Sequence, residues 1–533
     1  MKTNFLFLLI LLSLMINLNI VFAHEEKYPL GMNLAGIYDS STQFPFLDLT
    51  RQARKWISQM EGKPWGKGGD LVLDNHGWVR SLRPNQSVDW IFISKNGPLP
   101  DTEFVVWYEG DGKIDYSGLV RKVDTLGKNR DLIRVVSKGK YAILTIKKTN
   151  PDNYIRNIKI VAKKYLHLYE KGKIFNPQWL DYIRRFTAIR LMDWLKTNNS
   201  KISKWSDRPK LEDYTWSLKG VPIEVIVDLA NEIGSDVWLN IPHRADDDYV
   251  RRLARYVSDN LIDSHKIYLE HSNEVWNWRF QQTHYADKAA KRLWGKHGNG
   301  YIQWHAKRTV EICSLWRTER PKIKKRLQCV LGIQGGWYNL ALIALECPLW
   351  EKAPCYNGGI DALAIAGYFT GCVNGSGGID RIQRIRKWFS EKDEGMEKAY
   401  EQTLEGRYFD CKRTIISMKS KYKKFKDLAN KYGMSLLAYE GGQHITGNGL
   451  KIQNDKDFIR FHMKFNRTDY MRKLTFTNFE NWKMVGGGLF MYFDDISPPS
   501  KWGSWGSMDY LGDYTSPKYK AIIEFGTQNQ QWW

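Results

Sequence analysis

Residues 236–243 read DVWLNIPH, a nearly continuous apolar run that ends in a proline and a histidine. The segment 246–260 that follows is amphipathic and opens with three aspartates, as the first turn of a helix often does. An apolar strand followed by an amphipathic helix is the repeating unit of a parallel sheet that helices cover. This stretch therefore predicts an α/β fold, provided that the unit repeats along the chain.

The unit does repeat. Before this strand, apolar residues at helical spacing follow Pro222 and end at Gly234, which predicts a further helix. Strand-like segments occur at residues 30–36, 187–193, 236–243, 266–274, 329–334, 361–369, 435–440 and 488–494. Eight such units predict a (β/α)₈ TIM barrel, a fold of about 250 residues that tolerates insertions. A doubly wound open sheet is the alternative, but neither Gly-x-Gly-x-x-Gly nor a Walker pattern follows the first strand.

One long segment departs from this rhythm. From 64 to 168, turn residues separate short alternating runs such as 104–108, the pattern of an antiparallel β-sandwich. Apolar residues in 46–57 recur at helical spacing and predict a first helix before it. We therefore expect residues 24–63 and 169–533 to form the barrel. Residues 64–168 are expected to form a β-rich module inserted after the first strand and helix, which binds carbohydrate, narrows the cleft or braces the barrel.

The beginning of the chain predicts export. Lys2 precedes an apolar run at 5–14, and Ala23 is a small residue suited to cleavage, so residues 1–23 resemble a secretory signal peptide. A membrane anchor is the alternative, although two asparagines interrupt the apolar stretch and it is short for a span. We expect a secreted, extracellular protein without stable membrane insertion.

Cysteines and sequons fit the same compartment. An even number of cysteines predicts up to three disulfides, with fifteen possible connectivities among Cys313, Cys329, Cys347, Cys355, Cys372 and Cys411. No Cys-x-x-Cys pair occurs, which argues against zinc ribbons and thioredoxin-like redox sites. Surface glycosylation is expected at the Asn-x-Ser/Thr sequons of Asn85, Asn198, Asn374 and Asn466.

The charge balance points to the kind of partner. The net charge is +22, from 80 Lys plus Arg against 58 Asp plus Glu, which favours an anionic polysaccharide or cell surface. Nucleic acid is not expected, because the basic residues occur in ones and twos without a recognisable reading motif. Solvated lysine-rich faces would explain the same charge. Aromatic residues make up 14% of the chain, and their flat rings suit the faces of sugars.

Polar residues at the carboxyl ends of barrel strands line the active site in this fold. Glu274 ends the fourth strand-like segment, beside Asn273, and Glu440 ends the seventh. Two carboxylates facing one pocket can hydrolyse a glycosidic bond, because one protonates the leaving oxygen while the other attacks the anomeric carbon or activates water. Further candidates for substrate contact at strand ends and in the loops beside them are Arg190, His243, Tyr368, Trp276, Tyr492, Trp502 and Trp505.

The string EHSNEVWN at 270–277, together with YEGG at 439–442, resembles the clan A glycoside hydrolases, which are (β/α)₈ retaining enzymes that cleave β-linked glycans. The resemblance covers most of the chain outside 1–23 and the β-rich segment. It implies that Glu274 is the general acid/base and Glu440 the nucleophile. Asn273 would then donate a hydrogen bond to the sugar hydroxyl beside the anomeric carbon. No metal and no cofactor is expected.

The same resemblance implies that Arg190 and Tyr368 hold and ionise the nucleophile, and retention implies carboxyl groups roughly 5–5.5 Å apart. One departure concerns the eighth strand. Many relatives carry a Trp at its end, whereas this chain has Tyr-Phe-Asp-Asp at 492–495. Trp502 or Trp505 would have to form the floor of the sugar site instead.

Each assignment has a structural alternative. Glu274 would cap a helix that begins near Trp276, Glu440 would be a turn residue before two glycines, and Glu270 would be a buried barrel residue paired with a basic neighbour. A metal site at His243 and the aspartates after it lacks companion ligands.

Two other functions are alternatives to a glycoside hydrolase. The first is a non-catalytic carbohydrate-binding or cell-wall matrix protein on an enzyme-like barrel, although both carboxylates are present. A serine hydrolase would need a Gly-x-Ser-x-Gly elbow, which the sequence lacks. Sugar, linkage and oligomeric state are left open.

Overall fold

In the computed structural model of the chain, the structure describes residues 27–136 and 139–533. The predicted signal peptide, residues 1–23, lies outside the described residues. Eight parallel strands form one sheet in the spatial order β17-β16-β15-β14-β13-β12-β1-β18. They are β1 (Tyr28–Asn33), β12 (Phe186–Arg190), β13 (Asp236–Ile241), β14 (Ile267–His271), β15 (Leu327–Ile333), β16 (Ala362–Phe369), β17 (Ser435–Gln443) and β18 (Met491–Tyr492).

The sheet curves back on itself. A parallel bridge joins Ala438 to Phe490, next to β18, and the amide of Phe493 donates to the carbonyl of Gly441 on β17 at 2.9 Å. These contacts link the first and last strands of the spatial order, so the sheet is a nearly closed barrel. The (β/α)₈ fold and all eight predicted strands are therefore confirmed.

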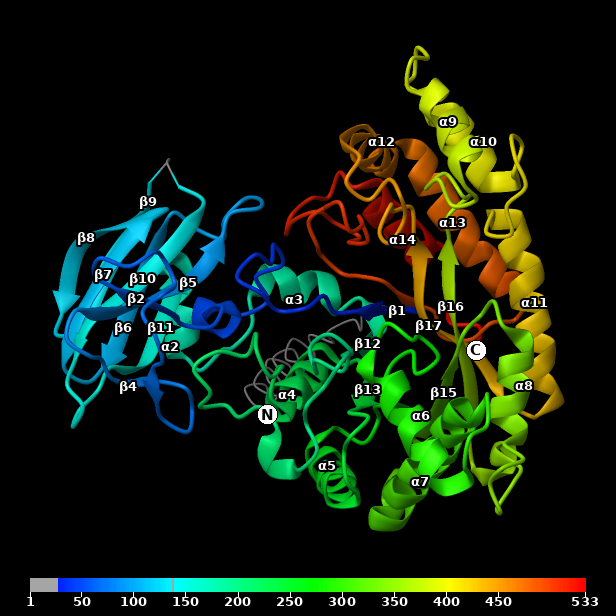
Figure 1. Cartoon of the computed structure of the whole chain (residues 1–533), viewed down its shortest axis with the longest axis horizontal. Helices are drawn as coiled ribbons and strands as arrows, with labels where there is room; N and C mark the ends of the chain where they lie inside the picture. The colour runs from blue at the N-terminus through cyan, green and yellow to red at the C-terminus, as the bar shows by residue number, and fades with distance from the viewer. Residues whose placement is uncertain (1–26, 137–138) are drawn as a thin grey trace, which may run out of the picture.

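Helices surround the barrel and alternate with its strands (Figure 1). They are α3 (Pro177–Ile183), α4 (Ile223–Ile233), α5 (Asp247–Asn260), α6 (Gln281–Trp294), α7 (Gly300–Glu319), α8 (Tyr338–Glu346), α9 (Ile379–Trp388), α10 (Met396–Glu405), α11 (Ile415–Lys431), α12 (Lys456–Asn466), α13 (Asp469–Met484) and α14 (Pro517–Gln528). The predicted ends of α4 and α5 are confirmed. Gly234 takes the left-handed conformation that ends α4, and the Asp246 side chain accepts from the Tyr249 amide at the start of α5.

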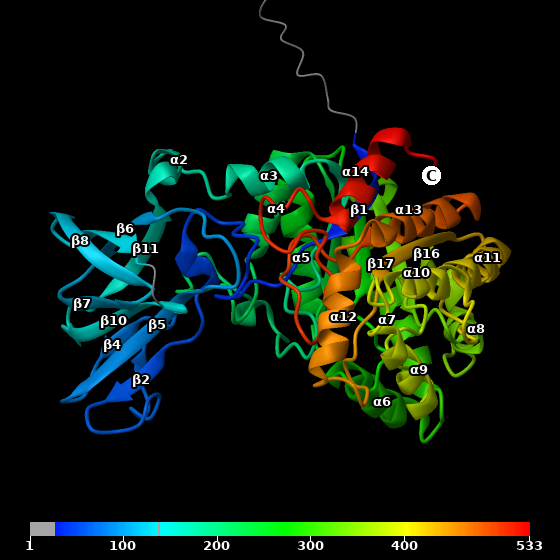
Figure 2. The ribbon, with the colours of Figure 1, turned by 90° about the horizontal axis from the view of Figure 1, so that it is seen from above.

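Two antiparallel sheets lie between β1 and β12 in the sequence, and both views place them at one side of the barrel (Figures 1 and 2). One has the order β2-β5-β10-β7, with β2 (Ile57–Met60), β5 (Gln86–Ser94), β10 (Tyr141–Thr149) and β7 (Gly112–Gly118). The other has the order β11-β6-β9-β8, with β11 (Arg156–Ala162), β6 (Glu103–Glu109), β9 (Arg130–Val135) and β8 (Val120–Gly127). The pair β3 (Val72–Leu73) and β4 (Val79–Ser81) and the short helix α2 (Leu166–Glu170) complete this β-rich region.

The helix predicted within 46–57 is wrong. The chain forms only a 3₁₀ turn at Leu49–Gln52 and then enters β2 at Ile57. Its apolar residues do not share one face, because Phe46 packs in the core between barrel and helices while Leu49 and Trp56 pack in the core of the antiparallel sheets. The apolar residues of 46–57 are therefore spaced as in a helix because they are divided between two cores, and not because they form one helical face.

A barrel loop anchors the β-rich region. Tyr214, between β12 and α4, packs in the core of the antiparallel sheets and stacks on Trp56 with ring centroids 5.3 Å apart. Its neighbour Thr215 donates to the carbonyl of Ala53 at 2.6 Å. The two antiparallel sheets are thus fixed to the barrel by packing as well as by the chain.

The six cysteines form three disulfides, Cys313–Cys329, Cys347–Cys355 and Cys372–Cys411. The last joins the loop after β16 to the segment before α11, and the amide of Thr370 in the same loop donates to the carbonyl of Arg413. Within the described ranges, no helix combines the length and the apolarity needed to cross a bilayer.

We predict that the double substitution Cys372→Ala/Cys411→Ala lowers the free energy of unfolding by about 4 kcal/mol, because the bridge closes a loop of 39 residues. The control Cys347→Ala/Cys355→Ala opens a loop of 8 residues and should cost about 2.5 kcal/mol. Urea unfolding of both variants measures the difference. A larger loss in the control would contradict the chain-entropy argument.

Candidate active site

Glu440 reaches the barrel interior through a β-bulge. In the register of β16 with β17, Ile365 pairs with Ala438 and Ala366 pairs with Glu440, so Tyr439 has no partner of its own. Leu437 and Tyr439 pack in the barrel interior, and regular alternation would therefore point Glu440 outward. The extra residue re-aims the next side chain, as bulges do beside active sites. Two consecutive residues, Tyr439 and Glu440, consequently both serve the interior.

Arg190, at the end of β12, organises this interior. It is completely buried and donates five hydrogen bonds. Its Nη1 lies 2.9 Å from Glu440 Oε1 and 3.0 Å from Asn33 Oδ1, and its Nη2 lies 2.8 Å from Glu270 Oε2 and 2.9 Å from Asn273 Oδ1. A buried guanidinium is stable only when its donors and its charge are satisfied, and here both are.

Glu270 is the buried barrel residue that the sequence allowed for. Besides Arg190, it accepts hydrogen bonds from Trp238 Nε1 at 2.8 Å and Asn240 Nδ2 at 2.7 Å. The space it occupies exists because β15 carries a glycine, since a Cβ on Gly332 would lie 2.7 Å from Glu270 Oε1. Its carboxylate is therefore held among fixed donors and serves to hold Arg190.

The sequence predicts a strand over 266–274, but Glu274 lies beyond the end of the strand. β14 ends at His271, and both Ser272 and Glu274 have positive φ values, 62° and 43°. Glu274 Oε2 accepts from Asn277 Nδ2 at 2.9 Å, and its Oε1 lies 3.4 Å from the Tyr439 hydroxyl. The helix-cap alternative fails, because α6 begins only at Gln281. The turn alternative for Glu440 fails likewise, since Glu440 lies within β17.

The two glutamates differ in what stabilises their charge. Glu440 accepts from the Arg190 cation and, through Oε2, from the Tyr368 hydroxyl at 3.0 Å, whereas Glu274 accepts only from neutral donors. Burial raises the pKa of Glu274, and burial together with the charge of Glu274 raises the pKa of Glu440 to about 8 against the opposing effect of Arg190. The carboxyls titrate as a coupled pair. Contact with a cation favours the ionised form of Glu440, so a proton held by the pair belongs on Glu274.

Both carboxyls face one pocket of about 480 Å³, which we call the glutamate pocket. Of the predicted substrate contacts, Asn273, Tyr368, Trp276 and Trp505 line it, and Phe493 supplies a ring from the end of the eighth strand. Arg190 lies beneath, reaching the pocket through Glu440. The remaining polar lining comes from Asp193, Asn198, Asn277, Arg279, Gln334, Arg413, Lys421, His444 and Asn448.

No protein-family model and no curated protein matches this sequence. Solved structures with similar folds include a xylanase 10B from Thermotoga maritima, with 12% identity, 66% of this chain and 93% of that chain covered, and a TM-score of 0.34. A family 5 xyloglucanase from Paenibacillus pabuli has 12% identity, 66% and 90% coverage and a TM-score of 0.37. Xylanase10C from Cellvibrio japonicus has 8% identity, 91% and 99% coverage and a TM-score of 0.36. By their names these proteins are two xylanases and a xyloglucanase. The barrel fold of this chain is shown by its own strand order.

Three predicted contacts lie outside the glutamate pocket. Tyr492 is fully buried and its hydroxyl donates to the carbonyl of Trp505, so it supports the pocket wall without lining it. Trp502 is exposed and is not among the residues that line the pocket. Its backbone carbonyl accepts a hydrogen bond from the Thr446 hydroxyl. His243, in the segment between β13 and α5, lines a neighbouring hollow instead.

Sequence reasoning missed the residues that bridge strand ends. Asn198 Oδ1 accepts from Asn273 Nδ2 at 3.1 Å and from Gln282 Nε2 at 2.7 Å, and Gln282 also donates to the Asn273 carbonyl. Tyr439 was passed over because strict alternation gives only one of two neighbours to the interior. Asn277 belongs to the quoted string EHSNEVWN, so its position was available, but its contact with Glu274 depends on a turn that no pattern encodes.

Burial limits the predicted glycosylation. Asn374 and Asn466 are buried, and Asn198 is half-buried in the glutamate pocket, so these three do not fit surface sequons. Asn85 is exposed in the turn before β5. A glycan could be accommodated on the folded surface there.

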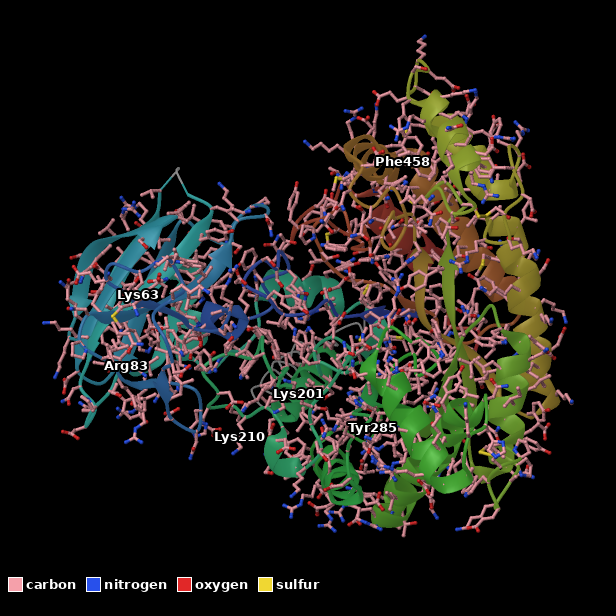
Figure 3. The ribbon with its side chains drawn as sticks, in the orientation of Figure 1. Lys63, Arg83, Lys201, Lys210, Tyr285 and Phe458 are labelled. Atoms are coloured by element: carbon pink, nitrogen blue, oxygen red, sulfur yellow. A yellow bond between two sulfur atoms is a disulfide. The ribbon has the colours of Figure 1, made fainter. Side chains whose placement is uncertain are left out.

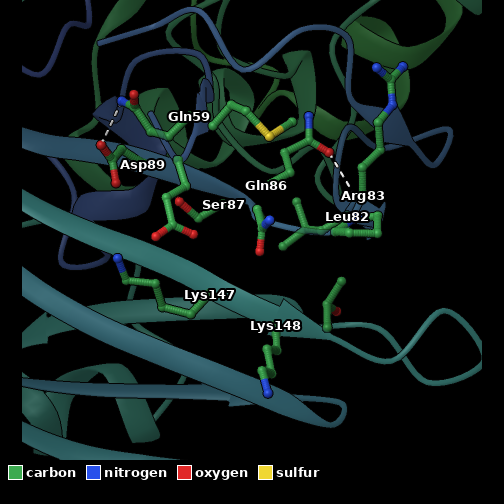
Figure 4. Close-up of a pocket in the computed structure, with 13 residues that line it drawn as sticks. Gln59, Leu82, Arg83, Gln86, Ser87, Asp89, Lys147 and Lys148 are labelled. Atoms are coloured by element: carbon green, nitrogen blue, oxygen red, sulfur yellow. Dashed lines mark hydrogen bonds between the residues drawn. The ribbon is translucent and has the colours of Figure 1, made fainter. Parts of the chain in front are cut away.

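A hollow of about 840 Å³ lies on the antiparallel sheets, where the sequence allowed for carbohydrate binding (Figure 4). It lies between Gln86 and Ser87 on β5 and the Lys147 and Lys148 side chains on β10. No aromatic side chain of the described residues lines it, and Asp89 accepts hydrogen bonds from Gln59 and Thr145. Carbohydrate binding by this region remains a prediction without a stacking platform to support it.

We predict that Arg190→Met lowers the free energy of unfolding by about 3–5 kcal/mol, because it leaves two buried carboxylates without their cation. Urea unfolding measures the loss. The control Arg252→Met removes an exposed pair with Asp248 and should cost less than about 1 kcal/mol. Equal losses would show that Arg190 does not organise the interior.

The pair should also make stability depend on pH. Because the two carboxyls titrate as a pair, the pKa of about 8 at Glu440 marks the loss of the one proton that the folded pair shares and that is favoured on Glu274, whereas a glutamate of the unfolded chain loses its proton near 4.5. The folded state therefore holds a proton that the unfolded chain has released, and the free energy of unfolding should fall as pH rises from 4.5 to about 8. Urea unfolding across this range should show a flatter profile for Glu440→Gln than for wild type. Glu212→Gln, an exposed control, should keep the wild-type slope.

Proposed function

We propose that this chain is a secreted glycoside hydrolase that cleaves β-linked polysaccharide by a retaining double displacement. The observation that carries the proposal is the asymmetry of two carboxyls at the mouth of a (β/α)₈ barrel. Glu440 accepts from Arg190 and Tyr368, and Glu274 accepts from neutral donors across the same pocket. Polar groups at this end of the barrel are where the fold carries out catalysis.

In the first step, the Glu440 carboxylate attacks the anomeric carbon while Glu274 gives its proton to the departing glycosidic oxygen, leaving a glycosyl ester on Glu440. In the second step, Glu274 takes a proton from water, the water oxygen attacks the anomeric carbon, and the ester bond breaks to restore Glu440. Asn273, fixed by Arg190 and Asn198, is positioned to donate to the hydroxyl beside the anomeric carbon. This chemistry needs no cofactor.

We expect Glu440→Gln to abolish hydrolysis in a panel of neutral and anionic β-linked polysaccharides, with retained binding. Glu274→Gln should lower kcat on polysaccharide by about 10²–10⁴-fold. The loss should be much smaller on dinitrophenyl glycosides, because that leaving group needs no proton. Rates of reducing-end release and of phenolate release measure the two effects.

Glu212→Gln is the matched control, since its carboxylate is exposed in the loop between β12 and α4. It should keep wild-type rates. If Glu440→Gln and Glu274→Gln also kept them, the two glutamates would not be the catalytic pair.

The stereochemistry of the product provides an independent test. A retaining mechanism requires the first product to keep the β configuration, which proton NMR of the anomeric signals detects within the first turnovers. An initial α product would indicate inversion, in which Glu440 activates water instead of forming a bond to the sugar.

A non-catalytic carbohydrate-binding or cell-wall matrix protein is the competing function. The exposed Trp502 and Trp278 give it some support, because exposed rings can adhere to sugar faces. It predicts that wild type and Glu440→Gln bind one polymer equally and that neither cleaves any member of the panel.

A further inference from the structure

A hollow of about 620 Å³ lies beside the glutamate pocket and is strongly basic. It forms between the loop after β12, the end of β13 and helix α6. We call it the basic pocket, and its cations are Lys201, Arg244, Lys288 and Arg292. No acidic residue is among the described residues that line it.

The two pockets share a wall. Asn199 and Gln281 line the basic pocket, and their chain neighbours Asn198 and Phe280 line the glutamate pocket. The Gln281 amide donates to Asn199 Oδ1 at 2.8 Å, which ties the two segments of this wall together. A polymer passing between Glu274 and Glu440 can therefore reach the basic pocket within a short stretch of sugar residues.

The cations of the basic pocket are unpaired. None of the four forms an ion pair with an acidic residue in the described part of the chain, whereas Arg251, Arg252 and Arg255 on the neighbouring helix α5 all do. Grouped like charges repel one another and raise the local positive potential. A solvated face would show the same exposure, but it would not collect unpaired cations in a concavity that adjoins two facing carboxyls.

The cationic lining continues into the glutamate pocket. Arg279, Arg413 and Lys421 line it, and they too lack an ion-pair partner among the described acidic residues. Lys421 is largely buried, and burial together with Arg413 lowers its pKa to about 8. Cations without an ion-pair partner among the described residues thus line both pockets, and in the glutamate pocket they accompany Asp193, Glu274 and Glu440.

An apolar surface accompanies these charges. Tyr285 on α6 is exposed at the basic pocket, and its ring meets His243 edge to face at 5.3 Å. Figure 3 labels Tyr285 and Lys201, which reach the pocket from helix α6 and from the loop after β12 respectively. A sugar ring against Tyr285 would present its substituents to the surrounding ammonium and guanidinium groups.

We propose that the basic pocket binds anionic substituents, carboxylate or sulfate ester, of an acidic β-linked glycan whose scissile bond lies between Glu274 and Glu440. This inference rests on the proposed function for the placement of the scissile bond. Binding of the anion by the basic pocket itself does not require hydrolysis.

The test measures binding of the full chain carrying Glu440→Gln to cellulose and xylan derivatives that share a backbone and differ in charge. Carboxymethyl cellulose and cellulose sulfate are compared with hydroxyethyl cellulose, and sulfated xylan with unmodified xylan. At least one anionic polymer should bind about tenfold more tightly than its neutral counterpart. Adding Lys288→Ala/Arg292→Ala should remove about tenfold of that affinity and leave neutral binding unchanged.

The control is Lys324→Ala/Lys325→Ala, which removes two exposed lysines from the 3₁₀ turn Pro321–Lys325 before β15, at the opposite end of the barrel. It should keep the preference for anionic polymers. If no anionic polymer binds more tightly than its neutral parent, or if both double variants lose affinity equally, the proposal is overturned. The carboxylate and sulfate arms decide which anion the pocket prefers.

Failure of this proposal and failure of the proposed function give different results. If wild type cleaves neutral glycans and Lys288→Ala/Arg292→Ala changes binding to no polymer, the proposal for the basic pocket is overturned and the proposed hydrolase function stands. If Lys288→Ala/Arg292→Ala abolishes charge-dependent binding but wild type cleaves no polymer, the proposal for the basic pocket stands and the proposed hydrolase function is overturned.

Discussion

The five hydrogen bonds of Arg190 are the interaction on which the site depends. Through them one guanidinium contacts side chains from β1, from β14 and its loop, and from β17, so four strand ends are held in a single arrangement. The charge cannot be removed from water without compensation, and Glu270 supplies it on one side while Glu440 supplies it on the other. Trp238 and Asn240 also fix Glu270, so the guanidinium of Arg190 is held in one position. The hydrogen bond from Arg190 then fixes the position of the Glu440 carboxyl.

This arrangement separates the two glutamates chemically. Both are buried, and burial alone would raise both pKa values. Only Glu440 touches the cation, so the ionised form is favoured there, and the neutral form is favoured at Glu274. The two carboxyls are thus distinguished by their neighbours and not by their depth. Tyr439 contacts both the cation and the second glutamate. Its ring centroid lies 5.3 Å from Arg190 Cζ, and its hydroxyl faces Glu274.

Basic side chains of the described residues differ in whether they form an ion pair with an acid. Many basic side chains pair with acids on the surface helices, as α5 illustrates, and such exposed pairs contribute little to stability. The cations that line the basic pocket and the glutamate pocket are unpaired among the described residues and adjoin one another. These cations carry part of the net charge of +22. Unpaired cations that adjoin one another raise the local positive potential at the barrel mouth.

The sequence by itself determined the barrel and the identity of the glutamate pair, because hydrophobic period and strand-end position are local properties that eight repeats reinforce. It also offered Glu270 as a buried, paired residue. Only the tertiary structure decided that Glu440 faces inward, since a β-bulge reverses the alternation at Tyr439. Only the structure divided residues 46–57 between two cores, withdrew His243 and Trp502 from the glutamate pocket, and paired the cysteines. These outcomes depend on residues far apart in the chain, whose proximity no local pattern records.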